Sequence, residues 1–240
     1  MALRRHILDA INHYRGTWAH LPSGKKSSMI PRFESSVGDD ELGMSERFLE
    51  FILSTPECFS RSSTAGHFTG SALVVNETLT SVLLTHHKKL GMWLQLGGHA
   101  DGHHLLHEVA MTEAHEESGL TNLSFLDNSA MGLRATGDGA AQTWPAPFDI
   151  DFHLIPTNHK DQEHLHFDVR YVVVAKSESL PIVSDESHDV RWFTLSEART
   201  LNNRRSMHRQ FDKIDWFRAQ RVASIANSSS GISAPRCSSS

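Results

Sequence analysis

The chain of 240 residues has only two cysteines, Cys58 and Cys237, and it has no long hydrophobic run. Two cysteines, one of them in a serine-rich segment, do not make a disulfide framework of the kind that small secreted domains use. A membrane-spanning helix needs about 18 or more consecutive apolar residues, and no segment reaches that length. The first residues carry two arginines without the apolar stretch of a signal peptide. These absences predict a cytoplasmic protein that does not enter a membrane.

An excess of positive charge is also missing. The chain has 23 Lys and Arg against 28 Asp and Glu, which gives a formal net charge of −5. This balance supplies no electrostatic reason to expect nucleic acid or an anionic membrane as a partner. The one enrichment is in histidine, with 17 residues. Such an excess indicates metal binding, a pH-sensitive surface or plain scatter.

The pattern along the chain predicts a mixed α/β domain with extensions at both ends. Residues 3–14 and 45–55 have apolar side chains at helical spacing, so we expect an N-terminal helical extension over residues 1–66. Short β-rich runs at 69–76 and 81–87 predict a hairpin, and further strands are expected at 92–96, 148–156, 164–175 and 189–195. Ser196 is a plausible N-cap of a last helix. We expect an α/β/α sandwich with a mixed sheet over residues 67–222, followed by a disordered serine-rich tail over residues 223–240.

The segment 97–120, GGHADGHHLLHEVAMTEAHEESGL, mixes histidines with carboxylates. It predicts a helix over 103–118, with Asp101 as a candidate N-cap and Gly119 as its C-terminal stop. At 100° per residue the apolar arc consists of Leu105, Leu106, Val109 and Ala110. Three carboxylates, Glu113, Glu116 and Glu117, continue this arc toward the interior.

Three inward carboxylates at this spacing repel one another unless a cation lies between them. Oxygen ligands suit a hard cation such as Mg²⁺ or Mn²⁺. The alternatives are a solvated surface helix whose glutamates meet scattered basic residues, and a zinc site formed by histidines. His103 and His107 have a suitable spacing for zinc, but nothing nearby in the sequence completes a ligand set. The carboxylates therefore favour a magnesium or manganese site.

These residues resemble the signature of the Nudix hydrolase superfamily. The signature runs Gly, five residues, Glu, seven residues, then Arg-Glu-apolar-any-Glu-Glu-any-Gly-apolar. The match in register over 23 positions consists of Gly98, Glu113, Ala114, Glu116, Glu117, Gly119 and Leu120. Two positions depart from it, since His104 stands for the early Glu and Thr112 for the Arg. With its flanking segments, the resemblance covers roughly residues 45 to 200 and is typical of a separate Nudix branch.

The resemblance implies a Nudix sandwich that hydrolyses a diphosphate linkage in a nucleoside diphosphate-type small molecule. It implies that Mg²⁺ or Mn²⁺ is held by the Gly98 carbonyl, Glu113, Glu116 and Glu117, with Glu113 and Glu116 also catalytic. The family often uses a further carboxylate as base or ligand, and Glu186 is the best candidate, with Asp185 and Asp189 as rivals. Because Thr112 cannot form the ion pair of the signature Arg, a catalytically weak ligand-binding or sensor protein is the alternative.

A second histidine cluster lies on two expected strands. Alternation puts His164, His166, Asp168 and Arg170 on one face of one strand, and it puts Asp149, Asp151 and His153 on one face of the other. If the strands pair, these residues form either a solvated outer face or a pocket beside the metal site. The second interpretation gives phosphate or ribose contacts to His153, His164, His166 and Arg170. The expected partner is a phosphate-containing small molecule, and a homodimer is left open.

Overall fold

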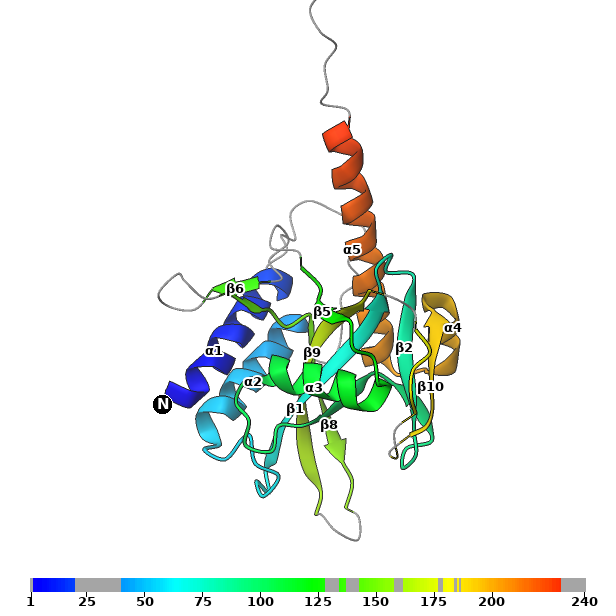
Figure 1. The fold of residues 1–240 in the computed structure, drawn as a ribbon. Helices are drawn as coiled ribbons and strands as arrows, with labels where there is room; N and C mark the ends of the chain where they lie inside the picture. Colours follow the sequence, from blue (N-terminus) through cyan, green and yellow to red (C-terminus); the bar gives the residue numbers. More distant parts are fainter. Residues whose placement is uncertain are drawn as a thin grey trace, which may run out of the picture.

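The computed structural model describes residues 2–19, 40–127, 134–136, 143–157, 162–176, 179–183, 185 and 187–229 (Figure 1). The helices are α1 (Ala2–Tyr14), continued by a π-helical segment (Arg15–Ala19), α2 (Glu41–Ser54), α3 (Leu106–Ser118), α4 (Leu195–Leu201) and α5 (Arg205–Ser229). The strands are β1 (Gly66–Asn76), β2 (Ser81–His87), β3 (Met92–Leu94), β4 (Leu96–His99), β5 (Leu123–Phe125), β6 (Arg134–Thr136), β7 (Thr143–Pro145), β8 (Asp149–Ile155), β9 (His164–Ala175) and β10 (Ser187–Thr194).

The described strands form an eight-stranded mixed sheet around one parallel pair, β1 and β9. The main path runs β10-β2-β1-β9-β5, while β3 pairs with β2, β4 pairs with β1 and β8 pairs with β9. At its N-terminal half, β1 is therefore flanked by β4 and β9, and β9 in turn by β8. The strands β6 and β7 form a separate small ribbon. The expected hairpin of β1 and β2 and the antiparallel pairing of β8 with β9 are confirmed.

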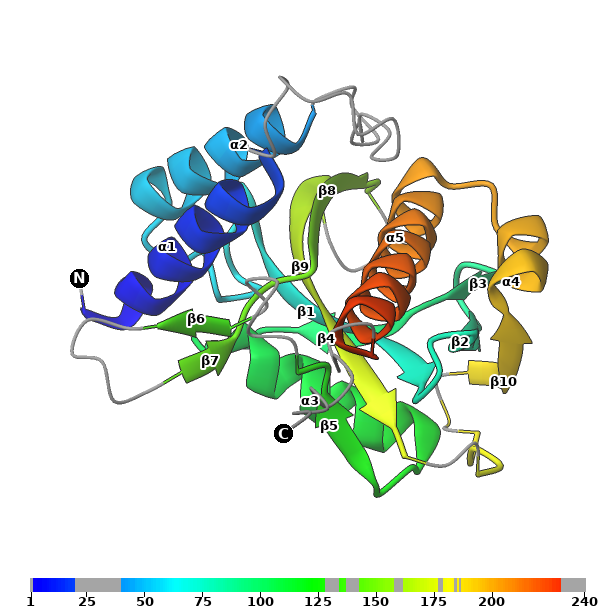
Figure 2. The ribbon, with the colours of Figure 1, turned by 90° about the horizontal axis from the view of Figure 1, so that it is seen from above.

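Helices cover both faces of this sheet, which confirms the α/β/α sandwich (Figure 2). One face carries the alternate residues Phe68, Gly70 and Phe167. Phe51 of α2 stacks on Phe167 with ring centroids 3.8 Å apart. At Gly70 an added Cβ would lie 2.6 Å from the Leu106 carbonyl oxygen at the start of α3, so glycine is needed for this close approach of helix and strand.

The opposite face carries Thr69 and Ser71 of β1 and the polar residues of β8 and β9, and α5 lies over it. Arg170 donates to the Ser206 carbonyl at the start of α5, and Gln210 of α5 donates to Gln95 before β4. The two faces therefore differ in chemistry, one aromatic and aliphatic, the other polar and charged.

Three local predictions about helix ends are wrong. Asp101 has φ 47°, a left-handed conformation, and the carboxylate helix begins only at Leu106, after Leu105, with no side-chain cap. The helix α4 is capped by Thr194 rather than Ser196, through a capping box with Glu197. The helix α5 runs to Ser229, so residues 223–229 continue a helix, and residues 230–240 lie outside the described residues.

The stop at Gly119 is confirmed, because Gly119 adopts φ 67° and its N–H donates to the His115 carbonyl. Within the described residues, no helix is both long enough and apolar enough to span a bilayer.

Candidate metal and substrate site

The loop between β4 and α3 is held by a salt bridge at its second residue, Asp101. The Arg61 guanidinium donates two hydrogen bonds to the Asp101 carboxylate, one of them from an Nη at 2.6 Å. This pair lowers the pKa of Asp101 below its usual value, chiefly through the hydrogen bond from Arg61. Both side chains are more than half exposed, so the pair orients the loop more than it stabilises the fold.

Glu113 of α3 lies directly against Gly98 of β4. A Cβ added to Gly98 would lie 1.9 Å from one carboxylate oxygen of Glu113 and 2.5 Å from its Cδ. The Glu113 carboxylate therefore occupies the space that a side chain at position 98 would take. The structure brings together two residues, Gly98 and Glu113, that the sequence assigned to one metal site.

Glu117, one turn further along α3, points at the neighbouring glycine. Its side chain accepts a hydrogen bond of 3.2 Å from the Gly97 N–H, and the residue is 7% exposed. Glu116, by contrast, is exposed. The expectation of three inward carboxylates is thus correct for Glu117, half correct for the partly buried Glu113 and wrong for Glu116.

The buried side of α3 is rotated relative to the predicted arc. Val109 and Ala110 are buried as expected, but so are His107, Ala114 and Ser118, which lie on the side of the helix away from Glu116. Glu116 lies outside this buried side and projects toward solvent. An exposed carboxylate beside two partly or fully buried ones is still compatible with a site that opens to solvent.

This donor set fits a hard divalent cation. It offers carboxylate oxygens from Glu113 and Glu117 around the backbone of the Gly97–Gly98 pair, with Glu116 on the solvent side. Mg²⁺ and Mn²⁺ prefer such oxygen ligands and retain several waters, which the open side allows. The residues present therefore fit the cation that the sequence predicts.

The two departures from the signature lie on the outside of the loop and helix. Thr112 is exposed and His104 is half-buried, with its ring 4.6 Å from that of Phe59. Neither supplies the charge that the signature has at its position. In this chain, Arg61 and Asp101 hold the loop instead.

The carboxylates near residue 186 are only partly described. Glu186 itself lies outside the described residues. Asp185 is exposed, and its carbonyl accepts a hydrogen bond from Lys88. Asp189 on β10 forms an ion pair with Arg191.

The polar patch on β8 and β9 is not a solvated outer face, because its charged half is buried beneath α5. Asp149, Asp151, Asp168 and Arg170 are each 3% exposed or less. Arg170 donates to Asp168 at 2.6 Å, to Asp149 at 3.0 Å and to Asp151 at 3.3 Å. The guanidinium of Arg170 is therefore enclosed by carboxylates, a position that favours holding the strands together over direct contact with substrate.

The helix α5 and the N-terminal helices complete this ionic network. Arg209 donates to both oxygens of Asp149, at 2.8 and 2.9 Å. Lys213 lies 2.7 Å from Asp149 and 2.8 Å from Glu41 of α2. Burial alone would raise the pKa of Asp149, but Arg209 and Lys213 hold it below its usual value.

Asp168 links this network to the strands nearer the carboxylates of α3. It accepts hydrogen bonds from Thr69 at 2.9 Å and Ser71 at 2.7 Å, both on β1, and from Gln95 at 3.2 Å. A carboxylate that accepts this many hydrogen bonds is fixed in place.

The other half of the patch is a cluster of five histidines at the N-terminal end of β1. His67, His99, His153, His164 and His166 come from β1, β4, β8 and β9, and each ring centroid is 4.7–5.5 Å from at least one other ring. His166 lies at the centre. We refer to these five residues as the histidine cluster.

Three histidines of the cluster, His67, His153 and His166, have pKa values below the usual value for histidine. Burial, followed by the neighbouring rings of His99 and His164, lowers the pKa of His67 to about 4. Burial and the same kind of neighbours lower the pKa of His166 to about 2. Burial also lowers the pKa of His153. Close packing of imidazoles therefore favours their uncharged, metal-binding form.

Sequence reasoning missed His67 and His99. His67 is 3% exposed, and neither of its ring nitrogens has a hydrogen-bond partner among the described residues. Leaving such a group unsatisfied costs about 1–3 kcal/mol. In sequence, His67 is an isolated histidine before a strand, and only its pairing opposite His166 gives it a role. The histidines at 103 and 107 do not join the cluster, since His103 pairs with Glu108 and His107 packs against the rings of His6 and Trp144.

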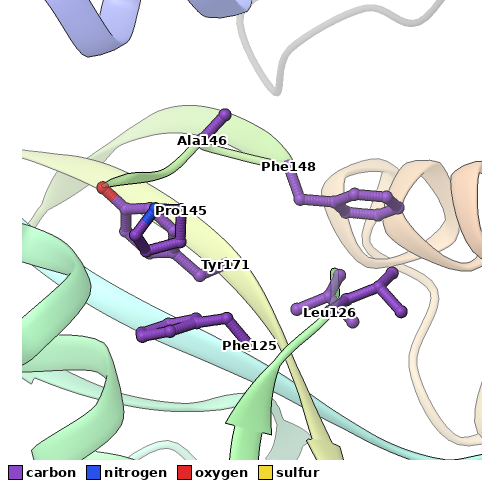
Figure 3. Close-up of a pocket in the computed structure, with 7 residues that line it drawn as sticks. Phe125, Leu126, Pro145, Ala146, Phe148 and Tyr171 are labelled. Carbon is purple, nitrogen blue, oxygen red and sulfur yellow. The ribbon is translucent and has the colours of Figure 1, made fainter. Parts of the chain in front are cut away.

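A small apolar pocket lies apart from these groups, between β5, β9 and the segment that leads into β8 (Figure 3). Its lining residues are Phe125, Leu126, Pro145, Ala146, Phe148, Tyr171 and Val172. None of these seven side chains carries a charge, and burial raises the pKa of Tyr171 above its usual value. The lining thus offers no ionic partner for a phosphate group.

Comparison with known proteins gives likenesses of fold. The chain is similar to a Nudix-family hydrolase from Clostridium perfringens, at 24% identity and a TM-score of 0.49, over 63% of this chain and 97% of the other. It is similar to an Ap4A hydrolase from C. elegans, at 14% identity and a TM-score of 0.46, over 64% and 98%. It is also similar to the dihydroneopterin triphosphate pyrophosphohydrolase of E. coli, at 12% identity and a TM-score of 0.43, over 61% and 92%.

No protein-family model matches the chain, and no curated protein matches it. Any assignment of activity therefore depends on the signature residues and on their geometry.

Proposed function

We propose that the protein is a Nudix-type hydrolase that uses Mg²⁺ or Mn²⁺ to cleave a diphosphate linkage in a nucleoside diphosphate-type small molecule. The observation that carries this proposal is the convergence of Glu113 and Glu117 of α3 on the Gly97–Gly98 pair of β4. The signature has a glycine and glutamates at these positions, and the fold puts them in contact although they are 15 or more residues apart in the chain.

In this proposal Glu113, Glu116, Glu117 and the Gly98 carbonyl hold the cation. When bound, such a cation neutralises charge on phosphate oxygens and lowers the pKa of water. Glu113 and Glu116 also orient the attacking water, and a carboxylate of the 185–189 segment acts as base. Glu186 is the candidate for that role, with Asp185 and Asp189 as the rivals.

The histidine cluster lies on the face of the sheet opposite the carboxylates of α3, so in this proposal its histidines contact a part of the substrate remote from the cation. His153 and His164 are half-buried and stand at the margin of the histidine cluster, where imidazole N–H groups can donate to phosphate or ribose oxygens. Arg170 acts indirectly, by fixing the carboxylates of both strands through its three ion pairs.

One observation favours a second candidate, a sensor that binds a nucleotide-like ligand without turnover. Thr112 is exposed and occupies the position of the signature Arg. Because a threonine cannot form an ion pair, Thr112 cannot take the role of the signature Arg in orienting a catalytic carboxylate. Both candidates predict a bound cation, and only the enzyme predicts hydrolysis.

The test compares Glu117→Gln with the native protein. The substitution keeps the shape of the side chain and removes the charge that a hard cation needs. A cation at ten times its Kd stabilises the native protein by about 1.4 kcal/mol, which raises Tm by roughly 3–6 °C for a chain of this size. We expect Mg²⁺ to raise the Tm of the native protein and to have little effect on the variant. With a screen of phosphate-containing metabolites, we expect turnover to fall by at least about 100-fold.

The matched control is Glu108→Gln, an exposed glutamate in the first turn of the same helix. It should keep both the Mg²⁺ shift and the turnover. A native protein whose melting does not respond to Mg²⁺ or Mn²⁺ would contradict the metal site. A normal shift without hydrolysis of any metabolite in the screen would favour the sensor.

A further inference from the structure

We propose that His67, His99 and His166 form a second metal site, for a transition-metal ion of the zinc type, on the face of the sheet opposite the carboxylates of α3. The site differs from the proposed magnesium site in its ligands, its metal and its position. It does not depend on the proposed hydrolase activity.

The geometry of three strands brings the ligands together. His67 on β1 is directly opposite His166 on the parallel strand β9, and His99 pairs through β4 with Thr69, two residues along β1. All three side chains therefore project from the same face. One ring nitrogen from each lies within 4.8 Å of the other two.

Small side-chain rotations are enough to close this triangle around an ion. With Zn–N distances of about 2.0–2.1 Å and tetrahedral angles, the ligand nitrogens lie roughly 3.3 Å apart. The rings need to approach by about 1.5 Å at most. His99 and His166 are only half-buried, so their side chains have room to rotate toward His67.

His67 supplies an independent argument for a ligand. It is almost fully buried, and both of its ring nitrogens are without a hydrogen-bond partner in the described parts of the chain. Buried polar groups normally have partners, and an exception calls for an explanation. An ion held by a ring nitrogen gives His67 the partner that it lacks.

The chemistry of the set selects the metal class. Neutral imidazole suits zinc and its neighbours in the first transition row, whereas Mg²⁺ prefers oxygen. Three protein ligands leave one tetrahedral position for water or a phosphate oxygen, as in catalytic zinc sites. His164 borders the three ligands, with its Nε2 3.2 Å from the Nε2 of His166. In this assignment His166 is a metal ligand and not a direct contact of substrate.

The two proposed sites are separated by one strand. Gly98 receives the Glu113 carboxylate on the α3 side, and the next residue, His99, projects to the other side of β4. A variant at either site therefore leaves the ligands of the other in place, which makes the two sites separable by experiment.

The experiment uses the full chain, stripped of metal with a chelator and kept in millimolar Mg²⁺ so that the carboxylate site is filled. Co²⁺ is added as a spectroscopic probe, and Zn²⁺ affinity is measured by competition with a chromophoric chelator. We expect one equivalent of Co²⁺ to give the strong visible absorption of a four-coordinate nitrogen site. We expect Zn²⁺ to displace it and Mg²⁺ not to.

The variants are His99→Gln and His166→Gln, with His188→Gln as the control because it removes an exposed histidine on β10. Mutation of a residue that only hydrogen-bonds to a metal ligand lowers metal affinity by roughly 10–100-fold. Loss of a ligand itself should therefore weaken Zn²⁺ binding by at least about tenfold. The control and Glu117→Gln should both keep the Co²⁺ spectrum. Far-UV circular dichroism of each metal-free variant checks that it folds. If the His67→Gln variant passes this check, it is included as a third ligand variant.

Two results would overturn the proposal. The first is a native protein that gives only the weak absorption of six-coordinate Co²⁺. The second is a set of folded variants, His99→Gln and His166→Gln, that bind Zn²⁺ as tightly and in the same number as the control. Binding would then belong to scattered surface histidines.

Discussion

Replacing Gly98 by alanine tests whether β4 positions the Glu113 carboxylate, separately from its contribution to the stability of the sheet. The backbone of Gly98 is not in the left-handed region, so alanine fits its conformation. The obstacle is the Glu113 carboxylate, whose nearer oxygen would lie 1.9 Å from the new Cβ. Because this group is the end of a flexible side chain, it can swing away.

The distance sets the size of the effect. To move from 1.9 Å to the 3.4 Å at which ordinary contact begins, the carboxylate oxygen must retreat by about 1.5 Å. A misplacement of about 1 Å at a catalytic group can cost roughly 100-fold in rate. We therefore expect Gly98→Ala to lower kcat/KM by about 100-fold or more and to weaken Mg²⁺ binding, while stability without metal changes by less than about 1 kcal/mol.

Gly70→Ala is the matched comparison, since it also adds one methyl group to a glycine facing α3. There the new Cβ would lie 2.6 Å from the Leu106 carbonyl oxygen and 3.0 Å from the Val109 Cβ, which cannot swing away. We expect a loss of about 1–3 kcal/mol in unfolding free energy.

Urea unfolding and the Mg²⁺-induced rise in Tm, measured on both variants and on the native protein, check these expectations. A Gly98→Ala protein with native Mg²⁺ response and native turnover would refute the contact between Gly98 and a functional Glu113. So would a loss of stability as large as that of Gly70→Ala.

Two further predictions concern the interior. Burial lowers the pKa of His107 from 6.5 to about 4. The neutral ring therefore stabilises the fold above pH 6.5. As the pH falls from 6.5 toward 4, the unfolding free energy loses this contribution, about 3 kcal/mol in all. Urea unfolding at pH 7.5 and 4.5 should show a smaller acid loss for His107→Phe than for the native protein, and equal losses would refute a buried neutral His107. Lys213→Met leaves Glu41 without its buried ion-pair partner and should lower the unfolding free energy by about 3–5 kcal/mol; adding Glu41→Gln should restore part of it, and strict additivity would contradict the pairing.

The sequence alone predicts those parts of the fold that depend on local pattern. The long strands β1, β2, β8, β9 and β10, the hairpin of β1 and β2, and the Gly119 stop follow from alternation, turn residues and glycine conformation. The short strands β5, β6 and β7 are not among the predicted strands, and the strand predicted at 92–96 is divided between β3 and β4. The convergence of Glu113 and Glu117 on the glycine pair also follows, because the signature and the helical period agree. The prediction for Glu116 is wrong because the buried side of α3 is centred nearer to Ala114 than the apolar residues suggest.

The histidine cluster could not be predicted, because it depends on strand register across long separations. His67 and His166 are 99 positions apart and meet only through the parallel pairing of β1 with β9. A shift of one residue would turn every second side chain to the other face. The burial of Asp149 could not be predicted either, since nothing local distinguishes its partners Arg209 and Lys213 from surface cations.

The ionic network beneath α5 has a consequence for the order in which the chain assembles. Lys213 donates to Tyr14, 199 positions earlier, and the same ammonium lies 2.7 Å from Asp149. During synthesis, the acidic face of the sheet emerges well before the lysine and arginine of α5 that neutralise it. Closure of such distant contacts is slow. We therefore expect the N-terminal helices to dock late, in one cooperative step with α5, so that nascent chains stalled before residue 205 stay sensitive to protease throughout.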